Sequence, residues 1–359
     1  MRFCGELRLA TKTLRCAAVE GDLAAVGTFA KEIVLLRLGE GLPAVERRLD
    51  FLDSDPYSVA LGGGRVFAGL RSGQLLLVEA NGDPAGLLST HSAVVSSLAW
   101  WGGLLASGAW DGSCAVTDAA TQQTLFAKKV GEYAVTVQFT AEGAVAVGLQ
   151  TGEVQLLAAG TYAPLHTVRG HEDIVRDIQR FGHRLATASN DGAVRVWTTE
   201  LESVGGVAAL HSSFVYTLCS VQLPGGEWVL ASAGEGRTLK LSDEREELAV
   251  LPHPGTVWRL VWDARRRRLL SFGEDGLCRC FALEAPTAED ETHARYAEQA
   301  GLQAAAAPNL TAADLQKFPD IARMAQTRGR REGEVRYGRG SGPWFDSATD
   351  FAALQLRYE

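Results

Sequence analysis

The sequence predicts an all-β fold, a seven-bladed β-propeller with a partly helical C-terminal extension. The first observation is local. An apolar run precedes the tight turn Asn190-Asp191-Gly192, and a second run, Ala193 to Trp197, follows it and alternates with period two. Such a turn between two apolar runs is typical of a β-hairpin. The second observation is that the unit recurs, with turn residues at Lys31, Gly73, Gly112, Gly152, Gly192, Gly236 and Gly276. The differences between successive numbers are 42, 39, 40, 40, 44 and 40, which indicates four-stranded propeller blades and is not explained by a β-sandwich.

The blades match the common pattern to different degrees. The segment Glu6 to Ala10 precedes the first turn, and because a propeller must close its ring, we expect this segment to form the outer strand of the last blade. In blade two, Asp55-Pro56-Tyr57 stands where a Gly-His pair is expected, and in blade four Val130 replaces the histidine. Blade one also lacks the histidine, whereas blades three, five, six and seven keep it, at His91, His171, His211 and His253.

Blade five has the most complete pattern. The residues five positions after the seven turns are Leu36, Val78, Thr117, Leu157, Trp197, Leu241 and Phe281. With Gly170-His171 before its first strand and Trp197 ending its third, blade five resembles the WD40 repeat family. That resemblance implies a structural hydrogen-bond network of His171, Asp191, Trp197 and a hydroxyl, either Thr187 or Ser189. A Ser-His-Asp catalytic triad is the alternative, and the network is favoured because buried polar groups must find partners inside the blade.

Composition sets limits on the function. The chain has 359 residues, 46% of them apolar, and a net charge of −8, so it lacks the cationic excess of a dedicated nucleic-acid binder. Its six cysteines are scattered, which favours buried thiols in a reducing compartment. Packing explains the pair Cys278 and Cys280 better than metal binding does. The sequence shows no phosphate loop, metal-ligand spacing, signal peptide or membrane-length apolar run. We therefore expect a non-enzymatic, cofactor-free monomer in the cytoplasm and nucleus, bound to neither nucleic acid nor membrane.

The sequence divides into three parts. Residues 1–283 hold the propeller, residues 284–310 form an acidic, alanine-rich linker, and residues 311–359 form a separate C-terminal segment. In that segment Thr311 is expected to cap a short helix. Within the propeller, the run Arg265 to Arg268 lies in a turn of blade seven; a solvated turn is favoured over a phosphate or acidic-peptide site.

A narrower resemblance comes from the order of these parts. A propeller, an acidic linker and a helix leading into Gly329, Glu332 and Gly333 together resemble the phospholipase A2-activating protein family of ubiquitin adaptors. The last three residues are similar to the entry of that family's ubiquitin-binding PFU domain, although Arg328 stands where family members usually have proline. Only 24 residues follow Val335 (359 − 335), so the PFU-like segment is expected to be partial or degenerate. A hexameric AAA unfoldase is a further partner that the resemblance implies, although we expect the PUL domain that docks on it to be absent from these residues.

The resemblance implies a non-catalytic ubiquitin-binding adaptor in ubiquitin-dependent protein turnover and ubiquitin recycling, with ubiquitin or ubiquitinated proteins as partners. The binding surface is expected on the propeller face that carries the loops before the first strands and the turns between the second and third strands. The candidate residues on this face are Trp110, Ile174, Arg176, Asn190, Phe214, Tyr216, Thr256 and Trp258. A WD40 scaffold for another intracellular complex, for example in RNA processing, is the alternative function.

Overall fold

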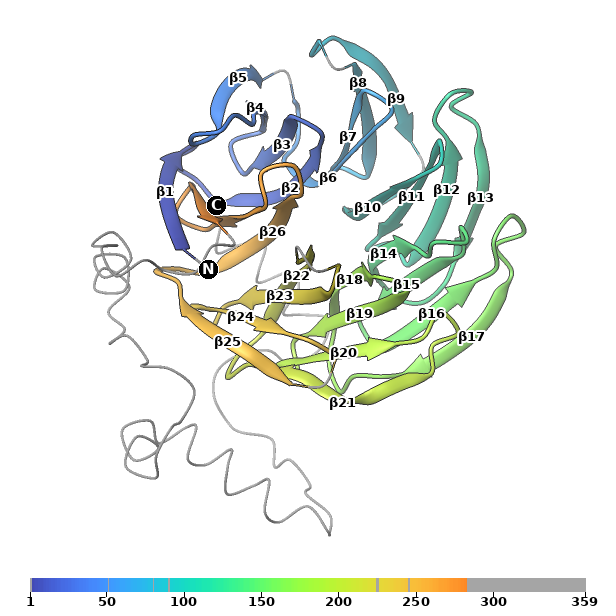
Figure 1. Ribbon diagram of the computed structural model, residues 1–359. Coiled ribbons are helices and arrows are strands. Elements are labelled where there is room, and N and C mark those ends of the chain that lie inside the picture. Colours follow the sequence, from blue (N-terminus) through green and yellow to red (C-terminus); the bar gives the residue numbers. More distant parts are fainter. Residues whose placement is uncertain are drawn as a thin grey trace, which may run out of the picture. The chain divides into compact units, whose positions relative to one another are not determined.

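The computed structural model describes residues 2–50, 52–79, 81–89, 91–223, 226–244 and 246–282. This part of the chain folds into seven four-stranded antiparallel sheets arranged around a central axis (Figure 1). The prediction of a seven-bladed all-β propeller is confirmed. The linker, the PFU-like segment and its residues Gly329, Glu332 and Gly333 lie outside the described residues. Among the described residues, none forms a helix long and apolar enough to cross a membrane.

The first four blades follow one another along the chain. Blade one contains β2 (Leu14–Glu20), β3 (Leu23–Thr28), β4 (Glu32–Arg37) and β5 (Ala44–Leu49). Blade two contains β6 (Pro56–Gly62), β7 (Arg65–Leu70), β8 (Gln74–Glu79) and β9 (Pro84–Ser89). Blade three contains β10 (Val95–Trp101), β11 (Leu104–Ala109), β12 (Ser113–Asp118) and β13 (Thr124–Lys129). Blade four contains β14 (Ala134–Phe139), β15 (Val145–Leu149), β16 (Glu153–Leu157) and β17 (Pro164–Arg169).

The last three blades complete the ring. Blade five contains β18 (Val175–Phe181), β19 (Arg184–Ser189), β20 (Ala193–Trp197) and β21 (Ser203–Leu210). Blade six contains β22 (Val215–Gln222), β23 (Trp228–Gly234), β24 (Thr238–Ser242) and β25 (Glu247–Pro252). Blade seven contains β26 (Val257–Asp263), β27 (Arg268–Gly273), β28 (Leu277–Ala282) and, from the other end of the chain, β1 (Arg2–Arg8).

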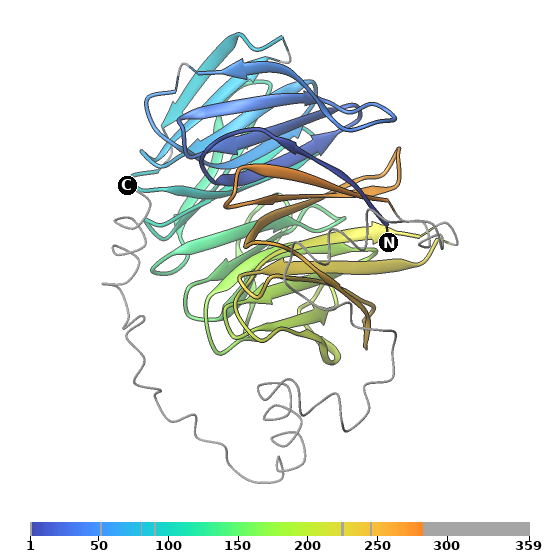
Figure 2. The same ribbon diagram turned by 90° about the vertical axis from the view of Figure 1, so that its left-hand side faces the viewer.

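Strand β1 closes the propeller. It pairs antiparallel with β28 as the outermost strand of blade seven, so the chain's first strand lies beside its last blade in both views (Figures 1 and 2). Phe3 packs on Phe281 with ring centroids 5.7 Å apart, and Arg279 forms an ion pair with Glu6 at 3.0 Å. The predicted closure is confirmed, although the strand spans Arg2–Arg8 rather than Glu6 to Ala10.

The turns before the third strands follow the predicted period with one correction. Lys31 takes a positive φ of 58° in blade one, as expected of a residue in place of glycine. In blade six the positive φ belongs to Arg237 (53°), and Arg237, not Gly236, accepts the backbone hydrogen bond from His253. The residue at the position of Trp197 is therefore the buried Ser242 rather than Leu241, because the turn residue of this blade is Arg237, one position after the glycine.

The arginine run of blade seven stabilises the junction with blade one. Arg265 and Arg266 both bind the carboxylate of Asp22, at 3.0 and 2.8 Å, and Arg266 holds the pKa of Asp22 below its usual value. Arg268 is buried and donates to Asp263 at 3.0 Å. Three of the four arginines thus bind acidic groups of this chain, so the turn is a structural junction rather than the solvated turn that the sequence predicted.

Candidate functional site

The polar residues of blade five form a structural network. His171 is buried; its Nδ1 lies 2.9 Å from Asp191 Oδ2 and its Nε2 lies 2.7 Å from Thr187 Oγ1. The same hydroxyl accepts a hydrogen bond from Trp197 Nε1 at 2.9 Å. Thr187 is therefore the network hydroxyl, whereas Ser189 lies at the margin, where its Oγ accepts the backbone N–H of Asp191. A Cβ at Gly170 would lie 2.5 Å from Trp197 Cζ2, which explains why glycine stands opposite the tryptophan.

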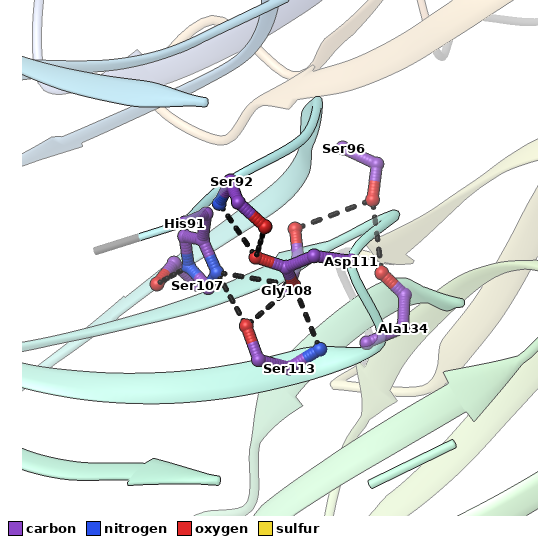
Figure 3. Close-up of polar contacts among 8 residues, drawn as sticks. All are labelled: His91, Ser92, Ser96, Ser107, Gly108, Asp111, Ser113 and Ala134. Atoms are coloured by element: carbon purple, nitrogen blue, oxygen red, sulfur yellow. Dashed lines mark hydrogen bonds and ion pairs between the residues drawn. The ribbon is translucent and has the colours of Figure 1, made fainter. Parts of the chain in front are cut away.

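Blade three repeats the network without a tryptophan (Figure 3). His91 contacts Ser113 Oγ at 2.7 Å through Nδ1 and Ser107 Oγ at 2.8 Å through Nε2. Asp111 accepts the backbone N–H groups of Ser92 and Ser113, so it ties the loop before β10 to the turn before β12. His211 and His253 make the equivalent contacts to buried serines, Ser232 at 2.8 Å and Ser271 at 3.0 Å. We call these four groups the blade networks.

The pKa values of the residues in the blade networks show that these side chains are shielded from water. Burial lowers the pKa of His211 to about 3 and that of His253 to about 4, because a buried imidazole loses the hydration of its cation. Burial alone would raise the pKa of Asp191. The hydrogen bonds from His171 and from two backbone N–H groups outweigh this effect, so the pKa of this carboxyl is lowered. Every named partner lies within one blade, so each network joins the strands of its own blade.

A second set of residues arises from a repeated backbone irregularity. Each inner strand has a β-bulge immediately after its first residue. A bulge re-aims the extra side chain, and here all seven extra residues line one cavity at the mouth of the central channel. We call this set the bulge ring; in blade order its members are Arg15, Tyr57, Ser96, Val135, Arg176, Tyr216 and Trp258.

Five members of the bulge ring form a continuous arc of stacked groups. Tyr216 and Trp258 lie parallel, with ring centroids 4.4 Å apart and an interplanar angle of 4°. Arg176 lies over Tyr216 at 5.5 Å from the ring centroid. Arg15 lies between Trp258 and Tyr57, at 4.7 and 5.0 Å. Guanidinium groups stack on aromatic faces through cation–π attraction, so the arc is held in shape by its own members.

The remaining blades leave the arc open on one side. Blades three and four contribute only Ser96 and Val135, whose side chains are small. Trp110 covers the rim there, with its ring 5.3 Å from that of Tyr57 and 6.3 Å from that of Tyr133. The enclosed cavity has a volume of about 60 Å³, enough for a few waters or one small polar group.

The structure brings together half of the residues predicted for this face. Trp110, Arg176, Tyr216 and Trp258 line the cavity. Two more support them: Asn190 accepts a hydrogen bond from Arg176 Nε at 2.7 Å, and the Phe214 ring lies 6.3 Å from that of Tyr216. Ile174 is buried and Thr256 is half-buried outside the cavity. Sequence reasoning missed Arg15 and Tyr57, although Leu14-Arg15-Cys16 and Pro56-Tyr57-Ser58 repeat the register of Val175-Arg176-Asp177.

In the part of the chain that the structure describes, no three His, Cys, Asp or Glu side chains gather to hold a metal ion. Cys278 and Cys280 are buried in β28, and burial raises the pKa of Cys278 to about 12, as expected of a packed thiol.

Comparison with known proteins agrees with this geometry. The model described as "WD domain, G-beta repeat" matches residues 162–198, which include the inner three strands of blade five. The chain therefore contains a WD40 repeat within a seven-bladed propeller. The WD40 β-propeller domain of Doa1 has the same fold, with a TM-score of 0.68 and 20% identity over 79% of this chain and 97% of that structure.

A curated protein, the ubiquitin homeostasis protein lub1 of Schizosaccharomyces pombe, is 31% identical over 126 residues. The match covers 34% of this chain and 17% of lub1, so the chain spans less than a fifth of that relative's length. This similarity supports the resemblance to the phospholipase A2-activating protein family that the sequence indicated.

Proposed function

We propose that this WD40 propeller is a non-catalytic ubiquitin-binding adaptor in ubiquitin-dependent protein turnover and that ubiquitin docks on the face around the bulge ring. The similarity to a protein named for ubiquitin homeostasis supports ubiquitin as the ligand. The exposed side chains of the arc of stacked groups support this face as the docking surface, and this arc is the main observation behind the proposal.

The chemistry of the face suits such a partner. Aromatic rings offer large apolar area at small entropic cost and dominate binding hot spots. Trp110, Phe214 and Tyr216 are each only partly buried and would contact ubiquitin directly. Trp258 and Ile174 are 7% and 9% exposed and would support those contacts from beneath.

The charge around the arc adds to this fit. Ubiquitin's recognition patch is aliphatic with basic neighbours, and carboxylates such as Asp173 and Glu235 lie on the loops at the rim. Opposite charges on the two partners favour encounter. A single module of this size is expected to bind with a dissociation constant in the micromolar range, about −8 kcal/mol or weaker.

Titration of labelled ubiquitin with the full chain tests the proposal. Phe214→Ala removes an accessible ring without cutting the Tyr216–Trp258 stack, and we expect binding to weaken at least about fivefold. Trp228→Ala is the matched control, because Trp228 is 39% exposed at the opposite end of the inner strands. Equal binding by both variants would show that ubiquitin docks elsewhere. No binding by the wild type would favour a WD40 scaffold for another complex.

A further inference from the structure

Arg15 is held differently from the other arginines near the channel. Its guanidinium carbon lies over both the Tyr57 and the Trp258 ring, at 5.0 and 4.7 Å from their centroids, and among the described residues no hydrogen bond or ion pair engages its N–H groups. By contrast, Arg259 at the same cavity pairs with the buried Asp177 at 2.9 Å. A guanidinium donates hydrogen bonds in its own plane, so cation–π contact with two rings leaves its N–H donors available. The Arg15 donors are therefore positioned in a plane and left for another group.

Arg176 brings a second positive charge to the same cavity. It lies on the opposite part of the bulge ring, over Tyr216, and donates from Nε to Asn190. Burial, and then the like charge of Arg15, lower the pKa of Arg176, while the nearby Asp173 offsets part of that effect. Since Asp177 and Arg259 neutralise each other, the cavity carries an excess of two positive charges from Arg15 and Arg176.

We propose that the channel mouth is a carboxylate-binding site for a peptide chain, with the edge of Arg15 as its principal donor and Arg176 as the second charge. A planar carboxylate matches the planar fork of a guanidinium, and the bond is charge-assisted. The cavity of about 60 Å³ admits one such group, and the rings around it provide apolar area for the adjoining residues of the peptide. This site does not rest on ubiquitin being the partner.

Carboxylate is favoured over phosphate by the surroundings. The rim carboxylates Asp173 and Glu235 would repel a dianion more strongly than a monoanion. Inorganic phosphate therefore serves as an opposing probe in the experiment.

The experiment uses the full chain and three fluorescent peptides that differ in one carboxylate. The first, Gly-Leu-Gly-Glu-Leu-Gly amide, carries a side-chain carboxylate; the second replaces Glu with Gln; the third has Gln and a free C-terminal carboxylate. Fluorescence anisotropy should show either the first or the third peptide binding about tenfold more tightly than the second, and the preferred one identifies the source of the carboxylate. Equal binding of all three peptides would overturn the proposal.

Variants locate the site. Arg15→Met keeps an unbranched stem between the two rings but removes the charge, so the preference for carboxylate should disappear; Arg15→Lys should keep part of it, since lysine lacks the fork. Arg169→Met, on the exposed outer strand β17, is the matched control and should behave as the wild type. Retention of the full preference by Arg15→Met would refute the assignment.

One measurement needs no variant. Acetate should displace the preferred peptide from the wild type at lower concentration than inorganic phosphate, and the reverse order would also refute the carboxylate assignment. The ubiquitin titration of the wild type fails or succeeds independently of these peptide arms, so the two proposals can be told apart.

Discussion

The blade networks and the bulge ring lie at the same end of the inner strands, but their polar groups are satisfied in different ways. In blade five, His171, Thr187, Asp191 and Trp197 bind one another and leave little to offer a partner. In the bulge ring, Arg15 is stacked rather than hydrogen-bonded, and its neighbours belong to blades seven and two. The networks are local to a blade and stabilise it; the ring depends on all seven blades and presents chemistry to the channel mouth.

The difference begins in the backbone. Regular antiparallel pairing places alternate side chains on opposite faces of a blade, where they pack against the next sheet. A bulge adds one residue and turns its side chain away from that packing, toward the axis. The residues after the bulges then join the blades: Leu260 N–H donates to Thr217 Oγ1 at 3.0 Å, and Leu218 N–H donates to Asp177 Oδ2 at 2.9 Å.

The largest effect is expected from opening the ring. Deleting residues 2–8 removes β1, which exposes the edge of β28 and the buried face of Phe281. The lost apolar burial and backbone pairing should lower the free energy of unfolding by more than about 3 kcal/mol, measured by urea denaturation. Peptide binding at the channel mouth should be lost with it, because Arg15 and Trp258 belong to the two blades that β1 holds together. Deleting residues 353–359 is the length-matched control, and an equal free energy of unfolding for both deletion variants would contradict this view.

A smaller but local effect is expected from Thr187→Val. The exchange keeps the shape of the side chain but removes the hydroxyl that contacts both His171 Nε2 and Trp197 Nε1, so two buried groups lose a partner. We expect the free energy of unfolding to fall by about 2–3 kcal/mol, while ubiquitin and peptide binding by the folded protein stay unchanged.

The exposed Thr167 of β17 provides the control variant Thr167→Val, which should change stability by less than about 0.5 kcal/mol. A stable Thr187→Val protein with weakened ubiquitin or peptide binding would mean that network and ring are not separate.

The sequence predicted the architecture well because it is periodic. Seven turns at intervals near 40 residues determine the number of blades, and the unpaired last blade requires the N-terminal segment to close it. The one error in register, Gly236 for Arg237, arose because glycine normally marks a positive φ and here an arginine takes it. Spacing alone does not show which of two adjacent residues adopts that conformation.

The candidate site was only partly predictable. Arg176, Tyr216 and Trp258 were found because blades five to seven keep a recognisable histidine, which sets the register. Arg15 and Tyr57 belong to blades without that histidine, and a bulge leaves no mark in the hydrophobic alternation. Thr187 and Ser189 are two apart on one face of β19, so only the reach of His171 from another loop decides between them.

The smallest effect is the dependence of stability on pH. It distinguishes the blade networks, which contain histidines, from the bulge ring, which contains arginines. His211 stays neutral in the folded protein, since burial and then the charge of Lys240 lower its pKa to about 3, whereas the unfolded chain protonates it near pH 6.5. Between these values the unfolded state binds more protons, so the stability that this histidine contributes is present above pH 6.5 and is lost as the pH falls toward 3. From pH 7.5 to 5.5 the loss from His211 should be on the order of 1 kcal/mol, measured as the change in unfolding free energy.

His211→Asn should remove that share of the pH dependence while leaving the share of His253, whose folded pKa is about 4. The bulge ring relies on arginines, which remain charged throughout this range, so binding of the carboxylate peptide to the folded protein should stay constant between pH 7.5 and 5.5. A pH-independent unfolding free energy would show that the histidines are not withdrawn from protons. Peptide binding that follows the histidine titration would place a network histidine at the channel mouth, where the structure puts none.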